Sequence, residues 1–165
     1  MPHPGGITKG EVSLRRLEAA DLDLIFVQEQ DPEALHMAGF TPEEPSDRAA
    51  FDAHWERIMA NDAIIKRAIL YDGEVAGHLA KFVMFDQPQV TYWLGREYWG
   101  KGIATRALQL FLDEHQERPL YGRCAHDNAG SIRVLEKCGF VQVGKDKGFA
   151  NARDEEIEEV ILRLD

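Results

Sequence analysis

The stretch of residues 90–105 constrains the fold most, because it joins a strand, a glycine turn and a helix start. Residues 90–94 are rich in β-forming side chains, and residues 96–102 form a loop with two glycines. A helix is expected to begin at Ile103. Glycines let the backbone approach a ligand closely, and the first helical N–H groups would point at that ligand. The stretch therefore predicts a binding site for a phosphate or pyrophosphate group.

Two classes of ligand could use such a loop. A nucleoside triphosphate would need a glycine, four residues, then Gly-Lys and a serine or threonine that holds magnesium. Gly95, Gly100 and Lys101 meet the first part of this pattern, but position 102 is a glycine and has no hydroxyl group. The triphosphate interpretation is therefore weak. Coenzyme A is the second class of ligand, and the evidence for it comes from the rest of the sequence.

The remaining pattern predicts strands and helices in alternation. Strands are expected at residues 12–17, 63–71, 75–85, 90–94, 120–125, 140–143 and 155–164, with an Asp72-Gly73 hairpin turn. Helices are expected from about residue 20, from Ser46 to about residue 60, from 103 to about 115 and from 128 to 137, with loops at 31–45 and 144–151. A crossover through the third of these helices should join the fourth and fifth strands.

This order of elements predicts an α/β (α+β) fold. We expect a single domain over residues 11–165, with a mixed central sheet of about six to seven strands flanked by about four helices. Residues 1–10 contain proline, histidine and glycine but no apolar core, so they are expected to be a flexible leader rather than a signal peptide.

The composition limits the partners of the chain. The net charge of −10, from 29 acidic and 19 basic residues, argues against a polyanionic partner such as nucleic acid. No apolar run is long enough to span a bilayer, so no membrane partner is expected. Cys124 and Cys138 lack metal-ligand spacing and fit small buried thiols in a reducing compartment. The expectation is a cytoplasmic protein, a monomer or a homodimer, that needs no metal.

Two blocks of sequence together resemble the GCN5-related N-acetyltransferase (GNAT) superfamily. The first block, Trp99-Gly100-Lys101-Gly102-Ile103-Ala104-Thr105, is similar to the acetyl-CoA loop of that family. The second block lies at residues 128–140 and contains Asn128, Ser131 and the run Glu136-Lys137-Cys138-Gly139-Phe140. It resembles most closely the RimJ/RimL-like branch, which acetylates the N-termini of ribosomal proteins.

The resemblance implies an enzyme that moves the acetyl group of acetyl-CoA onto a primary amine, on a protein N-terminus or a small molecule. It implies a backbone oxyanion donor near Leu94. The resemblance also implies two residues that act in catalysis. Ser131 would hydrogen-bond the sulfur of coenzyme A, and Asn128 would hydrogen-bond the pantetheine arm or a bound water. The implied cofactor-binding residues are Trp93, Leu94, Trp99, Gly100, Lys101, Gly102, Ile103, Ala104, Thr105 and Asn128. Many relatives have a tyrosine acid at a position that is Leu135 here.

Several roles stay open at this level. Asn128 is also placed to be a plain helix N-cap, and Ser131 to be a solvated helix serine. Trp55 is expected in the core, whereas the 31–45 loop is the candidate for substrate contact, through Leu35, Met37 and Phe40. Candidates for a general base are Asp86, Glu97, His126, Glu155 and Glu156, and His78 could face either side of its strand. The alternative function is a non-catalytic acetyl-CoA-binding sensor.

Overall fold

The computed structural model describes residues 10–165, so the expected leader at residues 1–10 lies, apart from Gly10, outside the described residues. The strands are β1 (Val12–Arg16), β2 (Ile65–Tyr71), β3 (Glu74–Met84), β4 (Gln87–Leu94), β5 (Leu120–Ala125), β6 (Val141–Ala150) and β7 (Glu155–Leu164). The helices are α1 (Leu22–Gln28), α2 (Pro32–Ala38), α3 (Arg48–Ala60), α4 (Ile103–Glu114) and α5 (Ala129–Lys137). Short 3-10 turns precede α1 and α4, at Ala19–Asp21 and Arg96–Tyr98.

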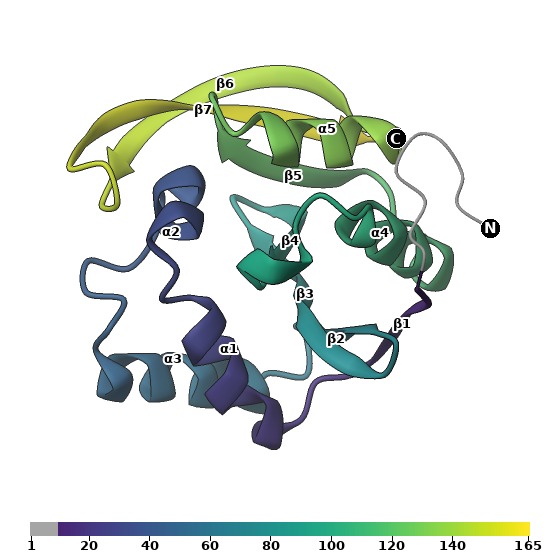
Figure 1. Cartoon of the computed structure of the whole chain (residues 1–165). Helices are drawn as coiled ribbons and strands as arrows, with labels where there is room; N and C mark the ends of the chain where they lie inside the picture. Colours follow the sequence, from purple (N-terminus) through teal and green to yellow (C-terminus); the bar gives the residue numbers. More distant parts are fainter. Residues whose placement is uncertain (1–9) are drawn as a thin grey trace.

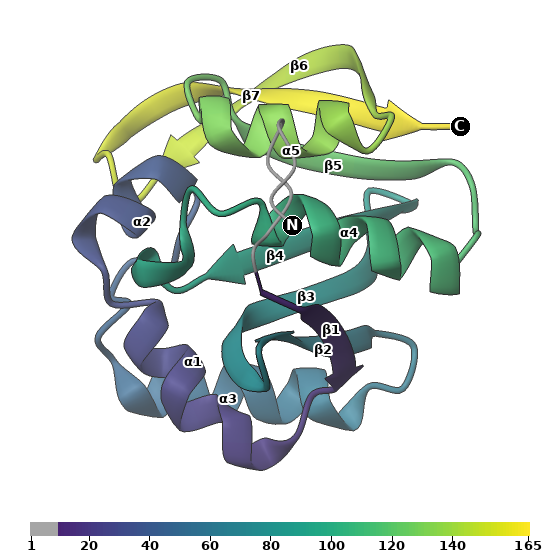
Figure 2. The ribbon, with the colours of Figure 1, turned by 45° about the vertical axis from the view of Figure 1, so that its right-hand side comes forward.

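The seven strands form one mixed sheet in the order β1-β2-β3-β4-β5-β7-β6 (Figures 1 and 2). Neighbouring strands are antiparallel except for β4 and β5, which are parallel and are joined through α4. The expected mixed sheet and the α4 crossover are confirmed. Over residues 10–165, no helix is long and apolar enough to cross a membrane.

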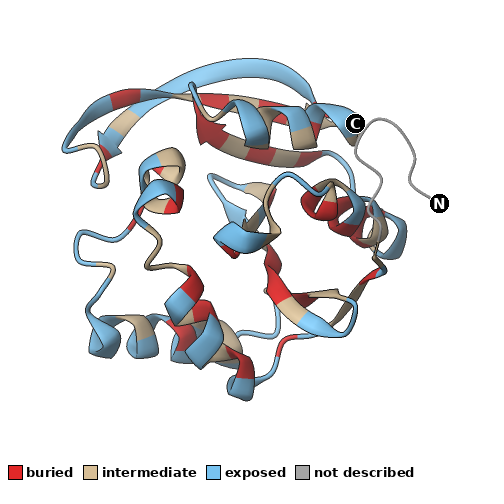
Figure 3. Ribbon diagram, viewed as in Figure 1, coloured by how far each residue is buried: buried red, intermediate tan, exposed pale blue. Residues whose placement is uncertain are grey.

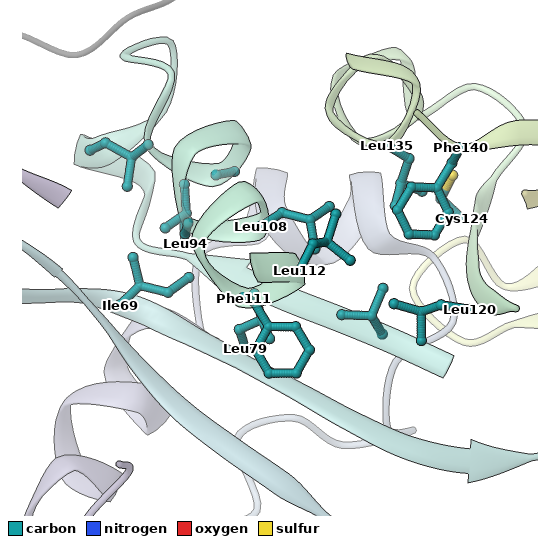
Figure 4. Close-up of a cluster of buried hydrophobic side chains, with 14 of the residues drawn as sticks. Ile69, Leu79, Leu94, Leu108, Phe111, Leu112, Leu120, Cys124, Leu135 and Phe140 are labelled. Atoms are coloured by element: carbon teal, nitrogen blue, oxygen red, sulfur yellow. The ribbon is translucent and has the colours of Figure 1, made fainter. Parts of the chain in front are cut away.

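The larger core lies on the face of the sheet covered by α4 and α5. Leu79 of β3 and Leu94 of β4 pack there with Leu108 and Phe111 of α4 (Figure 4). Leu135, the residue at the position of the family's tyrosine, is buried in the same core, on α5. This packing fixes α4 and α5 against the sheet, so the helix starts that precede them have defined positions.

A second, smaller core lies on the opposite face, beneath α1 and α3. Trp55 of α3 is buried there with Leu17, Ile25 and Ala68, so the expected core role of Trp55 is confirmed. His78 of β3 also faces this core, with its ring edge-on to Trp55 at a centroid distance of 5.3 Å. Burial lowers the pKa of His78 to about 4, which keeps the ring neutral at physiological pH. Most of α3 is exposed, whereas residues 76–80 of β3 are all buried (Figure 3).

The expected loop at residues 31–45 is wrong in its first part, because it contains α2. The Asp31 side chain accepts a hydrogen bond from the Ala34 N–H at 2.8 Å, and Pro32 occupies the first helical turn. Gly39 ends the helix with φ +72°. The proline and glycine that indicate a loop are thus the start and stop signals of a short helix. Likewise, α3 is capped by Asp47 rather than by Ser46.

The expected turn at residues 144–151 is also wrong, because β6 continues through it to Ala150. This strand lies at the edge of the sheet, pairs only with β7 among the described strands, and is exposed along most of its length. An exposed edge strand tolerates glycine and charged residues, so its sequence lacks the apolar alternation of a buried strand. The ambiguous tail is a strand as expected, and β7 spans Glu155–Leu164.

Gly77 provides a test of how closely β3 and β4 pack. A Cβ atom added there would lie 2.0 Å from the backbone oxygen of Trp93. We expect Gly77→Ala to lower the free energy of unfolding by about 2–4 kcal/mol, because the strand that carries the site must shift. Gly144→Ala is the control, since a Cβ there is 3.8 Å from its nearest neighbour, and we expect a change within about 0.5 kcal/mol. Equal losses in chemical denaturation would contradict this packing.

Candidate active site

The sheet opens between β4 and β5. Strand β4 pairs with β3 along its whole length, from Gln87 to Leu94. In the part of the chain that the structure describes, β4 and β5 share a single register pair, Gln89 with Tyr121. Beyond Gln89 the two strands no longer pair, and a cavity of about 560 Å³ lies against this end of β4. Residues from both faces of the sheet line it, so the cavity passes through the opening.

The cavity brings together ten of the eleven site residues predicted from the sequence. They are Trp93, Leu94, Trp99, Gly100, Gly102, Ile103, Ala104, Thr105, Asn128 and Ser131. Lys101 is the exception, because its side chain is exposed and is not part of the cavity wall. The two sequence blocks therefore form the two sides of one site, although they are far apart in the chain.

Of the remaining wall residues, the sequence had indicated only Met37, as a candidate for substrate contact. From β4 and the following turn the remaining residues are Tyr92 and Tyr98; from α2, Glu33, Ala34, Met37 and Ala38; and from α5, Gly130, Arg133, Val134 and Lys137. The α5 residues recur at intervals of three and four, which is the spacing of one helix face. That spacing could have identified them, once Ser131 was placed on the same helix. Glu33, Ala34 and Ala38 of α2 were not predicted, because their segment was taken for a loop and a loop has no helical face to compare.

The glycine loop and the start of α4 form the polar end of the cavity. Gly100 and Gly102 have φ values of +75° and +77°, a conformation that favours glycine. The first hydrogen bond of α4 runs from the Arg106 N–H to the Gly102 carbonyl, at 3.1 Å. The N–H groups of residues 103–105 therefore lie in the first turn of the helix, where no preceding helical carbonyl can accept from them. Arg133 and Lys137 add positive charge to the cavity wall from α5. This end suits an anion such as a pyrophosphate.

The backbone of Leu94 faces the opening. The Gly95 N–H donates to the Ala76 carbonyl of β3 at 2.9 Å, and backbone groups alternate in direction along an antiparallel pair. The N–H and carbonyl of Leu94 therefore point away from β3, toward the gap beside β5. The Trp99 indole N–H donates to the Leu94 carbonyl at 3.2 Å, which ties the loop to the end of the strand. The Leu94 N–H is thus directed into the opening.

Asn128 and Ser131 lie at the start of α5. The Asn128 side-chain oxygen accepts a hydrogen bond from the Ser131 N–H at 3.2 Å, so Asn128 is the helix N-cap. The Ser131 hydroxyl lies 3.0 Å from the Tyr92 hydroxyl, which reaches it from β4. Burial raises the pKa of Tyr92 to about 12. Two hydroxyl groups from opposite walls thus meet inside the cavity.

Two arginines hold α2 against the rest of the site. Arg96, in the turn after β4, forms ion pairs with Asp31 and Glu33 at the start of α2. Arg153, in the turn between β6 and β7, donates to the His36 carbonyl at 2.6 Å and makes two hydrogen bonds of 2.8 Å with the Asp127 carboxylate. Of the three residues expected to contact substrate, only Met37 lines the cavity, while Phe40 packs against a small separate core.

None of the residues considered as a general base lines the cavity. Asp86, Glu97, His126, Glu155 and Glu156 are exposed elsewhere, and His78 faces Trp55 on the other side of its strand. Among the described residues, no group of three or more His, Cys, Asp or Glu side chains is arranged to hold a metal ion.

Comparisons with known proteins identify this arrangement. A family model described as an acetyltransferase (GNAT) domain matches residues 11–141. The chain is 31% identical over 147 residues to a Bacillus subtilis protein named "Putative ribosomal N-acetyltransferase YdaF". The matched region covers 81% of this chain and 80% of the B. subtilis protein.

Solved structures have the same fold. RimL, a ribosomal L7/L12 α-N-protein acetyltransferase solved with coenzyme A, has a TM-score of 0.76 at 17% identity, with 94% of each chain covered. The spermidine N-acetyltransferase of Vibrio cholerae, solved with CoA and spermine, has a TM-score of 0.73 at 19% identity and covers 92% of this chain and 95% of that one. At these identities the likeness shows the fold, while the family model and the B. subtilis relative show the family. The chain therefore belongs to the GNAT acetyltransferase family, whose members are N-acetyltransferases acting on amines.

Proposed function

We propose that this protein transfers the acetyl group of acetyl-CoA to a primary amine, on a small molecule or at a protein N-terminus, by direct attack of the amine on the thioester. The observation that carries this proposal is the cavity in the opening between β4 and β5. Because its wall includes α4 and α5 from one face of the sheet and α2 from the other, the two reactants could enter from opposite sides and meet at the strand end.

The residues present fit coenzyme A. A volume of about 560 Å³ is within the ordinary range of small-molecule sites. The pyrophosphate would lie on residues 100–105, where the first N–H groups of α4 and the positive end of its dipole favour negative charge. A Cβ atom at Gly100 would meet nothing within 4 Å, so the loop leaves room for a ligand against its backbone. Arg133 and Lys137 supply cations on the facing helix.

The strand end and α5 would support the chemical step. Acetyl-CoA supplies an activated carbonyl carbon and a sulfur leaving group. The Leu94 N–H would donate to the carbonyl oxygen, in a hydrogen bond that strengthens as negative charge develops there. The Ser131 hydroxyl would donate to the sulfur as the carbon–sulfur bond breaks. Trp99 holds the Leu94 carbonyl, which keeps the strand end in position for this contact.

The amine would enter beside α2. That wall is mainly apolar, with Ala34, Met37, Ala38 and Trp93, and Glu33 is its acidic side chain. The Glu33 carboxylate could attract a cationic amine, although its ion pair with Arg96 offsets part of its charge. An α-amine has a pKa near 7.7–8.0 and loses its proton more readily than a lysine near 10.4. A cavity wall without an assigned base therefore suits an N-terminal amine or one of similar pKa.

A non-catalytic acetyl-CoA sensor is the second candidate function. It is favoured by Leu135, which is buried in the core and cannot donate a proton, and by the absence of the expected base residues from the cavity wall. Such a protein would bind acetyl-CoA and release no free thiol with any amine. Amine acetylation tolerates weak acids and bases, so we place the enzyme first.

We also propose that the protein works in a reducing compartment, the cytoplasm. Cys124 and Cys138 are both free thiols. Burial raises the pKa of Cys124 to about 12 and that of Cys138 to about 11, so neither is a reactive thiolate at physiological pH.

Calorimetric titration tests the proposed ligand. We expect acetyl-CoA to bind with a Kd on the order of micromolar and ATP with magnesium not to bind, because position 102 lacks the hydroxyl that holds magnesium. A panel of N-terminal peptides, polyamines and amino acids should then release free thiol with at least one amine. Binding without thiol release from any amine favours the sensor, and failure of acetyl-CoA to bind refutes both functions.

Gly100 provides a matched test of the loop. Gly100→Ala should lower stability by about 1–2 kcal/mol, because alanine is strained at φ +75°, and should also raise the Kd for acetyl-CoA at least about tenfold. Gly73→Ala is the control, since Gly73 has φ +84° in the turn between β2 and β3, away from the cavity, with similar open space around it. It should lose similar stability and keep its affinity. An equal loss of affinity in both variants, measured by calorimetry, would contradict the assigned loop.

A further inference from the structure

Tyr92 and Ser131 meet across the opening of the sheet. Tyr92 lies on β4, three residues after Gln89, whose pairing with Tyr121 is the only register pair of β4 and β5 in the described chain. Ser131 lies on α5, which follows β5. Their hydroxyl oxygens are 3.0 Å apart, and both residues line the cavity. The hydrogen bond is therefore made where the strands have separated, inside the space assigned to the thioester.

The chemistry of the site decides which hydroxyl donates. Either oxygen could donate in this pair. A serine hydroxyl has one proton, so if it is directed at a sulfur atom, its oxygen must accept the hydrogen bond from Tyr92. Burial raises the pKa of Tyr92 to about 12, and the phenol therefore keeps its proton at physiological pH. Tyr92 is then a constant donor to Ser131.

The backbone and the side chain of Ser131 are fixed by different partners. The Ser131 N–H donates to the Asn128 side chain, which fixes the backbone at the start of α5. This cap does not determine where the hydroxyl points, because the side chain can still rotate about its Cα–Cβ bond. The hydrogen bond to Tyr92 selects the rotamer, and it also polarises the Ser131 O–H.

We propose that Tyr92 is a positioning residue that donates to the Ser131 oxygen and thereby directs the Ser131 proton at the sulfur of coenzyme A. This inference rests on the proposed function. In the reaction the amine nitrogen forms a bond to the carbonyl carbon and the carbon–sulfur bond breaks, leaving a thiolate. The proton that the amine loses reaches the sulfur through solvent. Tyr92 and Ser131 keep their own protons throughout and lower the free energy of the thiolate.

A titration of bound CoA measures this effect without an amine substrate. A donor at the sulfur favours the thiolate, so it lowers the pKa of the bound thiol. The other titratable groups that act on Tyr92 are Cys124, at the end of β5, and Cys138, after α5. Burial raises the pKa of these thiols to about 12 and about 11, so they contribute little thiolate absorbance below pH 10. Subtracting the absorbance of the CoA-free protein at each pH removes the contribution of tyrosine phenolates, which ionise near pH 10.

The experiment compares the thiol pKa of CoA bound to the wild-type protein, Tyr92→Phe, Ser131→Ala and the double variant. Ser131→Ala should raise this pKa by about one unit, the scale of a lost hydrogen bond to a charged group. Tyr92→Phe keeps the ring and should raise it by about half a unit, because Ser131 retains its proton but not its direction. The double variant should match Ser131→Ala alone. Tyr121→Phe, a tyrosine of β5 outside the cavity wall, should match the wild type.

The outcomes separate the alternatives. A Tyr92→Phe variant that binds CoA with an unchanged thiol pKa overturns the inference and leaves the proposed function intact. A larger shift in Tyr92→Phe than in Ser131→Ala also overturns it, because Tyr92 would then be the direct donor to sulfur. If wild-type protein does not bind CoA, the proposed function fails and the inference fails with it. Where an amine substrate is found, Tyr92→Phe should lower kcat about threefold to tenfold and leave the KM for acetyl-CoA unchanged.

Discussion

The structure of the site depends on how β4 is paired on its two sides. It is bonded to β3 along its whole length, but within residues 10–165 it meets β5 at one register pair only, Gln89 with Tyr121. A continuous sheet would satisfy the outward backbone groups of Tyr92 and Leu94 with a neighbouring strand, whereas here they face a cavity. Buried backbone groups need partners. Trp99 supplies one for the Leu94 carbonyl, and the pantetheine arm of a ligand could supply others, almost as an added strand.

Because the strands separate, other contacts must hold the two halves of the sheet around the cavity. Arg96 binds the start of α2 to the turn after β4, and Arg153 binds its end to Asp127, next to the cap of α5. Tyr92 and Ser131 bridge the gap itself. Each contact joins segments that are distant in the sequence, and together they place α2, the glycine loop and α5 around one space. A substitution that removes any of these contacts should displace the residues of the site more than it destabilises the fold.

Much of this arrangement was predictable from the sequence, for physical reasons. Buried elements such as β5 and α4 have strong apolar periodicity, and the glycines at 100 and 102 require a backbone that few other residues adopt. The two family-like blocks and the end of β4 then identified half of the cavity wall. Prediction failed where an element is short or its residues are mostly polar. The edge strand β6 has no apolar alternation, and the signals that start and end α2 also indicate a loop. The Tyr92–Ser131 contact depends on how two distant segments meet, and local sequence contains no signal for it.

The central claim is that the outward face of β4 receives the acetyl donor, and amide hydrogen exchange at Leu94, followed by nuclear magnetic resonance, tests it most directly. The Leu94 N–H points into the opening, while by the same alternation the Trp93 N–H is bonded to β3 and serves as an internal control. If the account is correct, saturating acetyl-CoA slows exchange at Leu94 and leaves Trp93 nearly unchanged. Binding of acetyl-CoA with no added protection at Leu94 would contradict it.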